Sequence, residues 1–119
     1  MPIVDGNVGS FTAAAAIGKG VLVKLSAAGT VDIAALGENP IGVAEEPAFA
    51  AGDRIAVRYR SAAGTIKCKA SGAFAVGAVV YGRAAGLIDD ISTTSAIKIG
   101  TALEAATAAN DLVEVLPHP

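Results

Sequence analysis

The sequence predicts a small all-β protein, a compact sandwich or barrel of short strands with at most one short helix. Three observations support this fold class. Val, Ile and Leu supply the large apolar side chains, since aromatic residues make up only 4% of the 119 residues. Short β-type runs alternate with glycine turns along nearly the whole chain. The same order of residues also occurs twice, which indicates a repeated unit.

The first predicted hairpin joins residues 21–25 to residues 30–33 through Ala27-Ala28-Gly29. We expect a three-residue loop that places Ser26 opposite Thr30. The register expected from this loop is Val23 with Ile33, Leu25 with Val31 and Lys24 with Asp32. This register sends the apolar side chains inward and leaves an ion pair between Lys24 and Asp32 outside.

A second hairpin is predicted from residues 54–60, whose three arginines fall on one face of the strand and whose Ile55, Val57 and Tyr59 fall on the other. The chain then turns at residues 61–64 and continues into residues 65–69. A helix is plausible only at Thr101–Ala109, where Ala, Leu and Glu dominate.

The strongest internal signal is a repeat of the β unit. Residues recur in order with an offset of 57, as from Gly29 to Gly86, and later with an offset of 58, as from Asp53 to Asp111. We therefore predict two tandem copies of one β unit, at about residues 16–58 and 73–116, packed about a pseudo-two-fold axis.

The domain division that follows is an N-terminal arm at residues 1–10, a single β domain at residues 11–116 and a tail at residues 117–119. Gly29, Gly64 and Gly86 are predicted to sit in turns, and the turns at Gly29 and Gly86 are expected to use a positive φ. Because Gly29 and Gly86 serve the same turn in the two copies, replacing either one with valine is expected to destabilise the protein comparably.

Charge and cysteine content exclude several classes of protein. The net charge of −2 gives no signature of binding to nucleic acid or to a membrane surface. The longest apolar stretch, residues 70–82, is shorter than the roughly 20 residues that a membrane-spanning helix needs. Residues 1–5 lack the basic and apolar regions of a signal peptide. The single cysteine excludes an internal disulfide.

No group of residues has the pattern of a catalytic, cofactor or metal site. His118 stands between two prolines near the end of the sequence, and Cys68 is expected to be a small buried side chain. Glu45-Glu46 and Asp89-Asp90 are adjacent pairs whose side chains point to opposite faces of a strand. Gly18-Lys19-Gly20 leads into a strand and lacks the spacing of a phosphate-binding loop. We therefore expect no enzyme, no cofactor and no small-molecule substrate.

One face of the second predicted hairpin concentrates positive charge. We expect it to be either a solvated face or a docking surface for an acidic partner. Nucleic acid is disfavoured, because no aromatic side chain lies on that face to stack bases. The residues on this face are Arg54, Arg58, Arg60, Lys67 and Lys69.

The order of short motifs along the chain carries a family resemblance. The motifs are Gly20-Val21-Leu22-Val23, Pro40-Ile41-Gly42-Val43-Ala44, Ala75-Val76-Gly77, Ile99-Gly100-Thr101-Ala102 and Asp111-Leu112-Val113-Glu114-Val115. Taken in this order, they resemble a family of bacteriophage capsid cement proteins, over roughly residues 11–116. The resemblance implies a decoration protein on the outer surface of the phage head, made in the host cytoplasm. The implied partners are copies of itself, as a homotrimer, and the major capsid protein.

The arm and the basic face are the candidate contacts with the capsid. Ile3, Val4 and Val8 are apolar, and we expect them to become ordered against a neighbouring subunit or the capsid. Deleting residues 1–10 should therefore leave the thermal stability of the free protein nearly unchanged.

Two other functions fit an all-β chain of this size. A tail-associated or surface carbohydrate-binding module is the alternative, although such modules favour exposed aromatic side chains and this chain has no Trp. A lipoyl or biotinyl carrier presents its modified lysine at a hairpin tip. Here Lys67 and Lys69 fall within a predicted strand instead.

Overall fold

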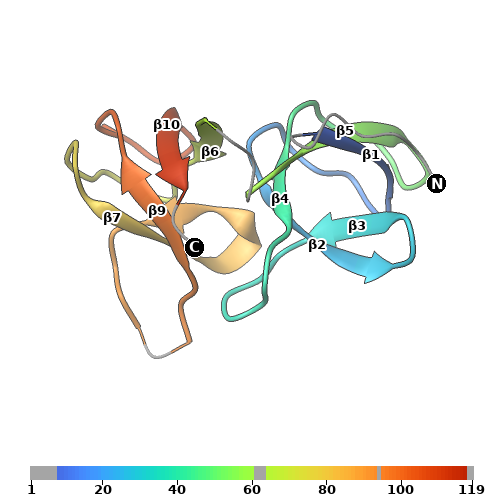
Figure 1. The fold of residues 1–119 in the computed structure, drawn as a ribbon, viewed down its shortest axis with the longest axis horizontal. Coiled ribbons are helices and arrows are strands. Elements are labelled where there is room, and N and C mark those ends of the chain that lie inside the picture. The colour runs from blue at the N-terminus through green and yellow to red at the C-terminus, as the bar shows by residue number, and fades with distance from the viewer. Residues whose placement is uncertain (1–7, 61–63, 94, 118–119) are drawn as a thin grey trace.

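The first half of the chain forms a closed β-barrel. The structure, a computed structural model, describes residues 8–60, 64–93 and 95–117, and its two halves lie side by side along the long axis (Figure 1). In the barrel the strand order is β1-β3-β2-β4-β5, and β1 closes it by pairing antiparallel with β5 and parallel with β3. The strands are β1 (Val8–Ala13), β2 (Leu22–Ala27), β3 (Thr30–Ile33), β4 (Gly42–Ala44) and β5 (Arg54–Tyr59).

The second half forms a five-stranded sheet with the order β6-β10-β9-β7-β8. A single parallel bridge between Ala70 and Ile88 links the two edges of this sheet. The elements are β6 (Ile66–Lys69), β7 (Val79–Gly82), the short 3₁₀ helix η1 (Ala84–Gly86), β8 (Ile88–Asp89), β9 (Lys98–Ala102) and β10 (Leu112–Pro117). The all-β prediction is confirmed, because η1 is the only helical segment in the described part of the chain.

The two sheets have the same strand pairing at matched offsets. The pair Thr12 and Arg54 between β1 and β5 corresponds to the pair Lys69 and Leu112 between β6 and β10. The parallel pair of Ala13 and Val31 corresponds to the bridge of Ala70 and Ile88. The correspondence also includes β1 and β6, which lie before the predicted starts of the two copies at residues 16 and 73.

Two buried clusters make up the core. The first contains nine residues from the first barrel, among them Ile17, Val23 and Val57. The second contains eleven residues of the second half together with Leu22, Ala34 and Val43 from the first. Because three first-half side chains belong to the second cluster, the two halves share apolar packing rather than merely touching.

The halves pack head to tail, so the predicted pseudo-two-fold axis is wrong. A two-fold relation requires that a contact made by a residue of one half is repeated by its counterpart in the other half. A Cβ at Gly20 would overlap the Leu112 side chain, whereas a Cβ at Gly77, the counterpart of Gly20, would meet nothing within 4 Å. Likewise, a Cβ at Gly86 would lie 2.7 Å from the Leu22 carbonyl oxygen, whereas Gly29 borders open space.

The first hairpin forms with the expected central register but differs at its end. Val23 pairs with Ile33, Lys24 with Asp32 and Leu25 with Val31, as predicted. A bulge then pairs Ala27, rather than Ser26, with Thr30. Leu25 is exposed instead of inward-facing.

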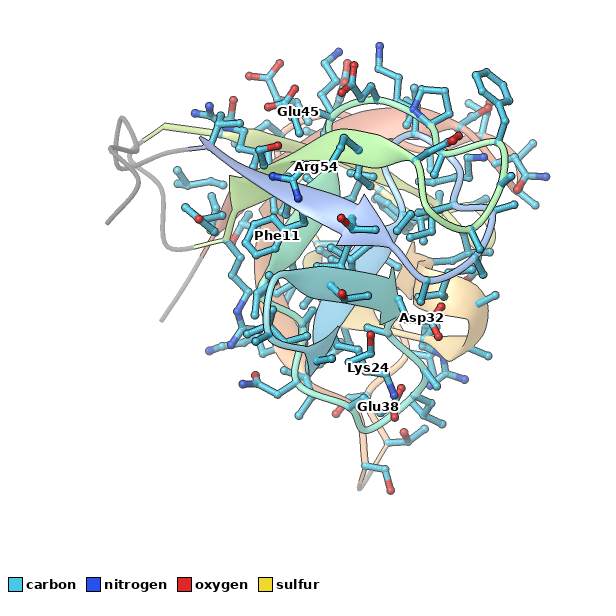
Figure 2. The ribbon with its side chains drawn as sticks, turned by 90° about the vertical axis from the view of Figure 1, so that its right-hand side faces the viewer. Phe11, Lys24, Asp32, Glu38, Glu45 and Arg54 are labelled. Carbon is cyan, nitrogen blue, oxygen red and sulfur yellow. The ribbon has the colours of Figure 1, made fainter. Side chains whose placement is uncertain are left out.

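The predicted ion pair of this hairpin is also wrong. Lys24 pairs with Glu38, from the loop after β3, and not with Asp32 (Figure 2). The Asp32 carboxylate instead accepts a hydrogen bond of 2.8 Å from the backbone N–H of Ile33. Asp32 lies opposite Lys24 in the hairpin, but its carboxylate is engaged by the backbone of the next residue. Glu38, which is farther along the chain, forms the ion pair with Lys24 instead.

The predicted hairpin of residues 54–69 does not form. β5 pairs with β1 and β4 in the barrel, whereas β6 pairs with β10 in the other sheet. The chain crosses from one half to the other between these strands. The alternation of residues 54–60 identified a strand correctly, but a local turn signal does not determine which strand becomes its neighbour.

One predicted helix and two predicted domain boundaries also differ from the structure. Residues 101–109 contain the end of β9 and turns rather than a helix. Val8–Ser10 belong to β1, where they pair with residues 56–58 of β5, so the β domain begins before Phe11. β10 likewise includes Pro117, the first residue of the predicted tail.

Candidate docking surface

The most exposed large apolar side chain in the described part of the chain is Phe49, in the connection between β4 and β5. Its exposed fraction is 83%. The loop that carries it is held in place from inside: Asp53 Oδ2 accepts hydrogen bonds from the backbone N–H groups of Phe49 (2.8 Å) and Ala50 (3.2 Å). Ile17 and Ala48 exchange two backbone hydrogen bonds of 2.9 Å beside it. The aromatic ring is therefore presented to solvent by a fixed backbone.

The second half contains the same loop frame with a different side chain. Asp111 Oδ2 accepts hydrogen bonds from the N–H of Thr107 (2.9 Å), the Thr107 hydroxyl (2.9 Å) and the N–H of Ala108 (3.2 Å). These bonds, led by the one from the Thr107 N–H, lower the pKa of Asp111 below its ordinary value. Thr107 occupies the position of Phe49, so this loop presents an aromatic ring only in the first half.

Sequence reasoning missed Phe49 as a candidate contact. Aligning the two halves places it opposite Thr107. The signal that could have identified Phe49 is this difference: a large apolar residue stands in one turn and a polar residue stands in the matched turn.

Acidic side chains accept backbone hydrogen bonds beside these loops. Glu46 Oε1 accepts a hydrogen bond of 3.0 Å from the Ala56 N–H, and Glu104 Oε1 accepts one of 2.8 Å from the Glu114 N–H. Glu45 lies on the outer surface, at the opposite end of the first barrel from Glu38 (Figure 2). Among the described residues, no three or more His, Cys, Asp or Glu side chains lie close enough together to hold a metal ion.

The Asp89-Asp90 pair is similarly occupied. Asp89 Oδ2 accepts a hydrogen bond of 2.8 Å from the Ser71 hydroxyl, and its Oδ1 accepts one of 2.8 Å from the Asp90 N–H. The Asp89 carboxylate therefore fixes the backbone where β8 ends.

The five predicted basic contacts do not lie on one hairpin, because β5 and β6 do not pair with each other. Arg54 Nη1 donates to Thr12 Oγ1 (3.1 Å), and Arg58 Nε donates to the Thr65 carbonyl (2.8 Å). Arg60 reaches Asn39 and the carbonyl of Lys98, both at 3.4 Å, and desolvation lowers its pKa. The predicted face disperses because β5 and β6 belong to different sheets.

The two lysines of this set lie at the junction of the halves. Lys67 Nζ is 3.9 Å from Glu104 Oε1, and both side chains are about half exposed, so screening by water leaves this pair little weight. A Cβ at Gly18 would lie 3.2 Å from Lys69 Nζ. A shallow depression beside them is lined by residues of both charge signs: Lys19, Gly20, Val43, Ala44, Glu45 and Lys67. As expected, the Gly18-Lys19-Gly20 segment leads into the strand β2.

The remaining candidate residues lie at separate places in the chain. Cys68 is fully buried, as predicted, and desolvation raises the pKa of its thiol to about 12. Ile3, Val4 and His118 lie outside the described residues, whereas Val8 is half-buried in β1. Gly29, Gly64 and Gly86 have φ values of 72°, 91° and 72°, which only glycine adopts readily. No helix in the described ranges combines the length and the apolar character needed to cross a membrane.

Comparison with known proteins identifies the family. The family model described as "phage cement protein" matches residues 3–117. The chain belongs to the phage cement protein family. The predicted resemblance is thereby confirmed, and this cement protein has a structural role associated with the phage capsid.

A solved structure supports the fold of this cement protein. The structure described as the head fiber gp8.5 N base in bacteriophage phi29 superposes with a TM-score of 0.74 and 18% sequence identity. The match covers 93% of this chain and 92% of that chain. At this identity the match shows a shared fold. No curated protein matches the chain.

Proposed function

We propose that the protein decorates the outside of a phage head as a homo-oligomer, a trimer, and that it has no enzymatic activity. It is made in the host cytoplasm and binds the major capsid protein. Membership of the cement protein family supports the virion role. The similar fold of a protein described as a phage head fiber base is consistent with a position on the head.

The exposure of Phe49 is the observation that supports an attachment surface at this loop. The ring of Phe49 is 83% exposed, so its apolar area does not stabilise the free subunit. The same area would contribute free energy of binding if a partner covered it. The ring is held by the Asp53 carboxylate and the bridge at Ala48, so docking it orders little additional backbone. A rigid aromatic anchor of this kind is typical of residues that dominate binding energy.

The contacts proposed from the sequence remain part of the function, as separate positions. Arg54 is exposed on β5, and the Lys67 side chain is 59% exposed. Such positive charges steer an approach to an acidic surface more than they add affinity. Arg58, Arg60 and Lys69 are half-buried, and Ile3, Val4 and Val8 are the proposed N-terminal contacts.

We also propose that the two halves are copies of one ancestral unit. Matched strand order, matched register and the paired carboxylate frames of Asp53 and Asp111 support this origin. Loss of the aromatic ring at Thr107, or its gain at Phe49, then gave the halves different roles.

Binding to undecorated heads tests the proposed function. Purified protein is mixed with heads that lack it, and the bound fraction is measured by co-sedimentation. Phe49→Ala should weaken binding by at least about tenfold, which corresponds to ~1.4 kcal/mol. Leu36→Ala is the matched control, because Leu36 is an exposed apolar loop residue (39%) close in sequence to Glu38, away from the Glu45 end.

Wild-type protein that fails to sediment with heads contradicts the proposed function. Equal binding by wild type and Phe49→Ala contradicts the assignment of Phe49 while leaving head decoration in place. A binding signal lost on addition of free sugars would instead support the carbohydrate-binding alternative.

A further inference from the structure

The junction within the chain uses a different surface of each half. The first half contributes Leu22, Ala34 and Val43, which lie in the core of the second half. The second half contributes Leu112, whose side chain lies against Gly20, and the positions of Gly82 and Gly86. A Cβ at Gly82 would meet Leu22, and a Cβ at Gly86 would meet Val21. Because the two surfaces differ, each half keeps one of them uncovered.

The second half leaves uncovered the surface that the first half buries. The counterparts of Leu22 and Ala34 are Val79 and Ile91, with exposed fractions of 38% and 48%, against 1% and 2% in the first half. Tyr81 pairs with Asp89, and Val79 and Ile91 each stand two residues beyond this pair along the chain. Val76, next to the open position of Gly77, is 64% exposed. We call Val76, Val79 and Ile91 the open face.

The first half leaves uncovered the surface that the second half buries. The counterparts of Gly82, Gly86 and Leu112 are Leu25, Gly29 and Arg54, which we call the free end. Leu25 is 52% exposed, Arg54 is exposed, and a Cβ at Gly29 would meet nothing within 4 Å. Figure 2 looks onto this end of the barrel, and Figure 1 shows β7 at the opposite end of the molecule.

We propose that a second copy of the chain docks its free end onto the open face, repeating the junction between the halves. In this contact Leu25 of one copy packs against Val79 of the next, as the Gly82 position packs against Leu22 within one chain. The contact is heterologous, so successive copies close into a ring or continue as a filament. The inference deepens the proposed function, since it names the surfaces by which the homo-oligomer forms.

The contact between copies also differs from the junction in its backbone hydrogen bonding. Within the chain, the Lys69 N–H donates to the Gly20 carbonyl at 2.9 Å, which ties the two halves together by their backbones. The counterpart of Lys69, Thr12, donates its N–H to Gly29 of its own barrel, also at 2.9 Å. The first barrel stays closed, and association between copies therefore depends on apolar side chains rather than on a backbone hydrogen bond.

Cross-linking of single-cysteine surface variants tests this contact. Leu25→Cys and Val79→Cys are purified separately, mixed, and treated with a short bis-maleimide, both in solution and on heads. The native Cys68 serves as an internal blank, because its thiol is fully buried. The mixture should give a cross-linked dimer, whereas each variant alone should not. Leu36→Cys mixed with Val79→Cys is the matched control, since Leu36, like Leu25, is an exposed leucine of the first half (39% and 52%).

Two results would overturn the inference. One is a mixture that cross-links no more than the Leu36 control in either setting. The other is a Val79→Cys variant that cross-links with itself as strongly as with Leu25→Cys, which indicates a two-fold contact. As an independent check, Val79→Asp should weaken self-association by at least about tenfold in light scattering, equivalent to ~1.4 kcal/mol, with an unchanged melting temperature. Head binding without cross-linking rejects this contact alone, whereas cross-linking without head binding rejects the proposed function alone.

Discussion

Leu22 begins β2 of the first barrel, yet its side chain lies in the core of the second half, 3.3 Å from where a Cβ at Gly82 would stand. Its exposed fraction is 1%, whereas Val79, at the matched place in the second half, is 38% exposed. The two halves consequently share one cooperative core, and we expect them to unfold together.

Leu22→Ala should lower the free energy of unfolding by about 2–5 kcal/mol, because it leaves a cavity in a fully buried site. Val79→Ala, the matched control, should cost less than about 1 kcal/mol in the free subunit. Urea unfolding followed by circular dichroism measures both. Separate transitions for the two halves, or equal costs for the two variants, would contradict the shared core.

Gly86→Ala should destabilise the protein more than Gly29→Ala, which revises the equal effects expected from the repeat alone. Both glycines have a φ of 72°, so an alanine is strained by about 1–2 kcal/mol at either position. At Gly86 the new Cβ also meets Val21 and the Leu22 carbonyl, which adds about 1–3 kcal/mol of overpacking. Equal midpoints of urea unfolding for the two variants would show that the junction accommodates a Cβ at Gly86 without added cost.

A chain that begins at Phe11 should be less stable than one that begins at Val8. The three residues that differ pair with Ala56, Val57 and Arg58 in the closed barrel. Their loss removes several backbone hydrogen bonds, each contributing about 0.5–1.5 kcal/mol. Thermal melting of the two chains measures the difference. Coincident melting curves would instead support the sequence-based expectation that residues 8–10 belong to an N-terminal arm.

Acid should destabilise the wild type more steeply than Asp111→Asn. The hydrogen bonds from Thr107 and Ala108 lower the pKa of Asp111 in the folded state. Its contribution to stability is therefore present above its unfolded pKa and is lost as the pH falls through the lower folded value, below about pH 4. The free energy of unfolding measured between pH 6 and pH 2 tests this. Parallel curves for the two proteins would show that the carboxylate contributes no pH-dependent stability.

The repeat in the sequence predicted much of the architecture because it reports strand identity. Offsets such as that from Gly29 to Gly86 locate matched strands, and the register around Lys24 and Asp32 follows from the turn between them. All-β structure follows from the short runs rich in Val and Ile. Such signals are local, and they are reliable where partners are close in sequence.

The errors came from partners that are distant in sequence. The turn after Arg60 looked like a hairpin, but β5 and β6 are each satisfied by strands of their own half. Dispersal of the five basic residues followed from that single error. The ion partner of Lys24 and the exposure of Phe49 depend on where loops arrive in space, which no periodic pattern encodes.

The most direct test of the central claim is an electron cryo-microscopy map of heads with and without the bound protein. We expect additional density on the outer surface of the shell, arranged as a closed oligomer, with the loop of Phe49 against the major capsid protein. Additional density inside the shell or on the tail, or no difference between the two maps at saturating protein, would contradict it.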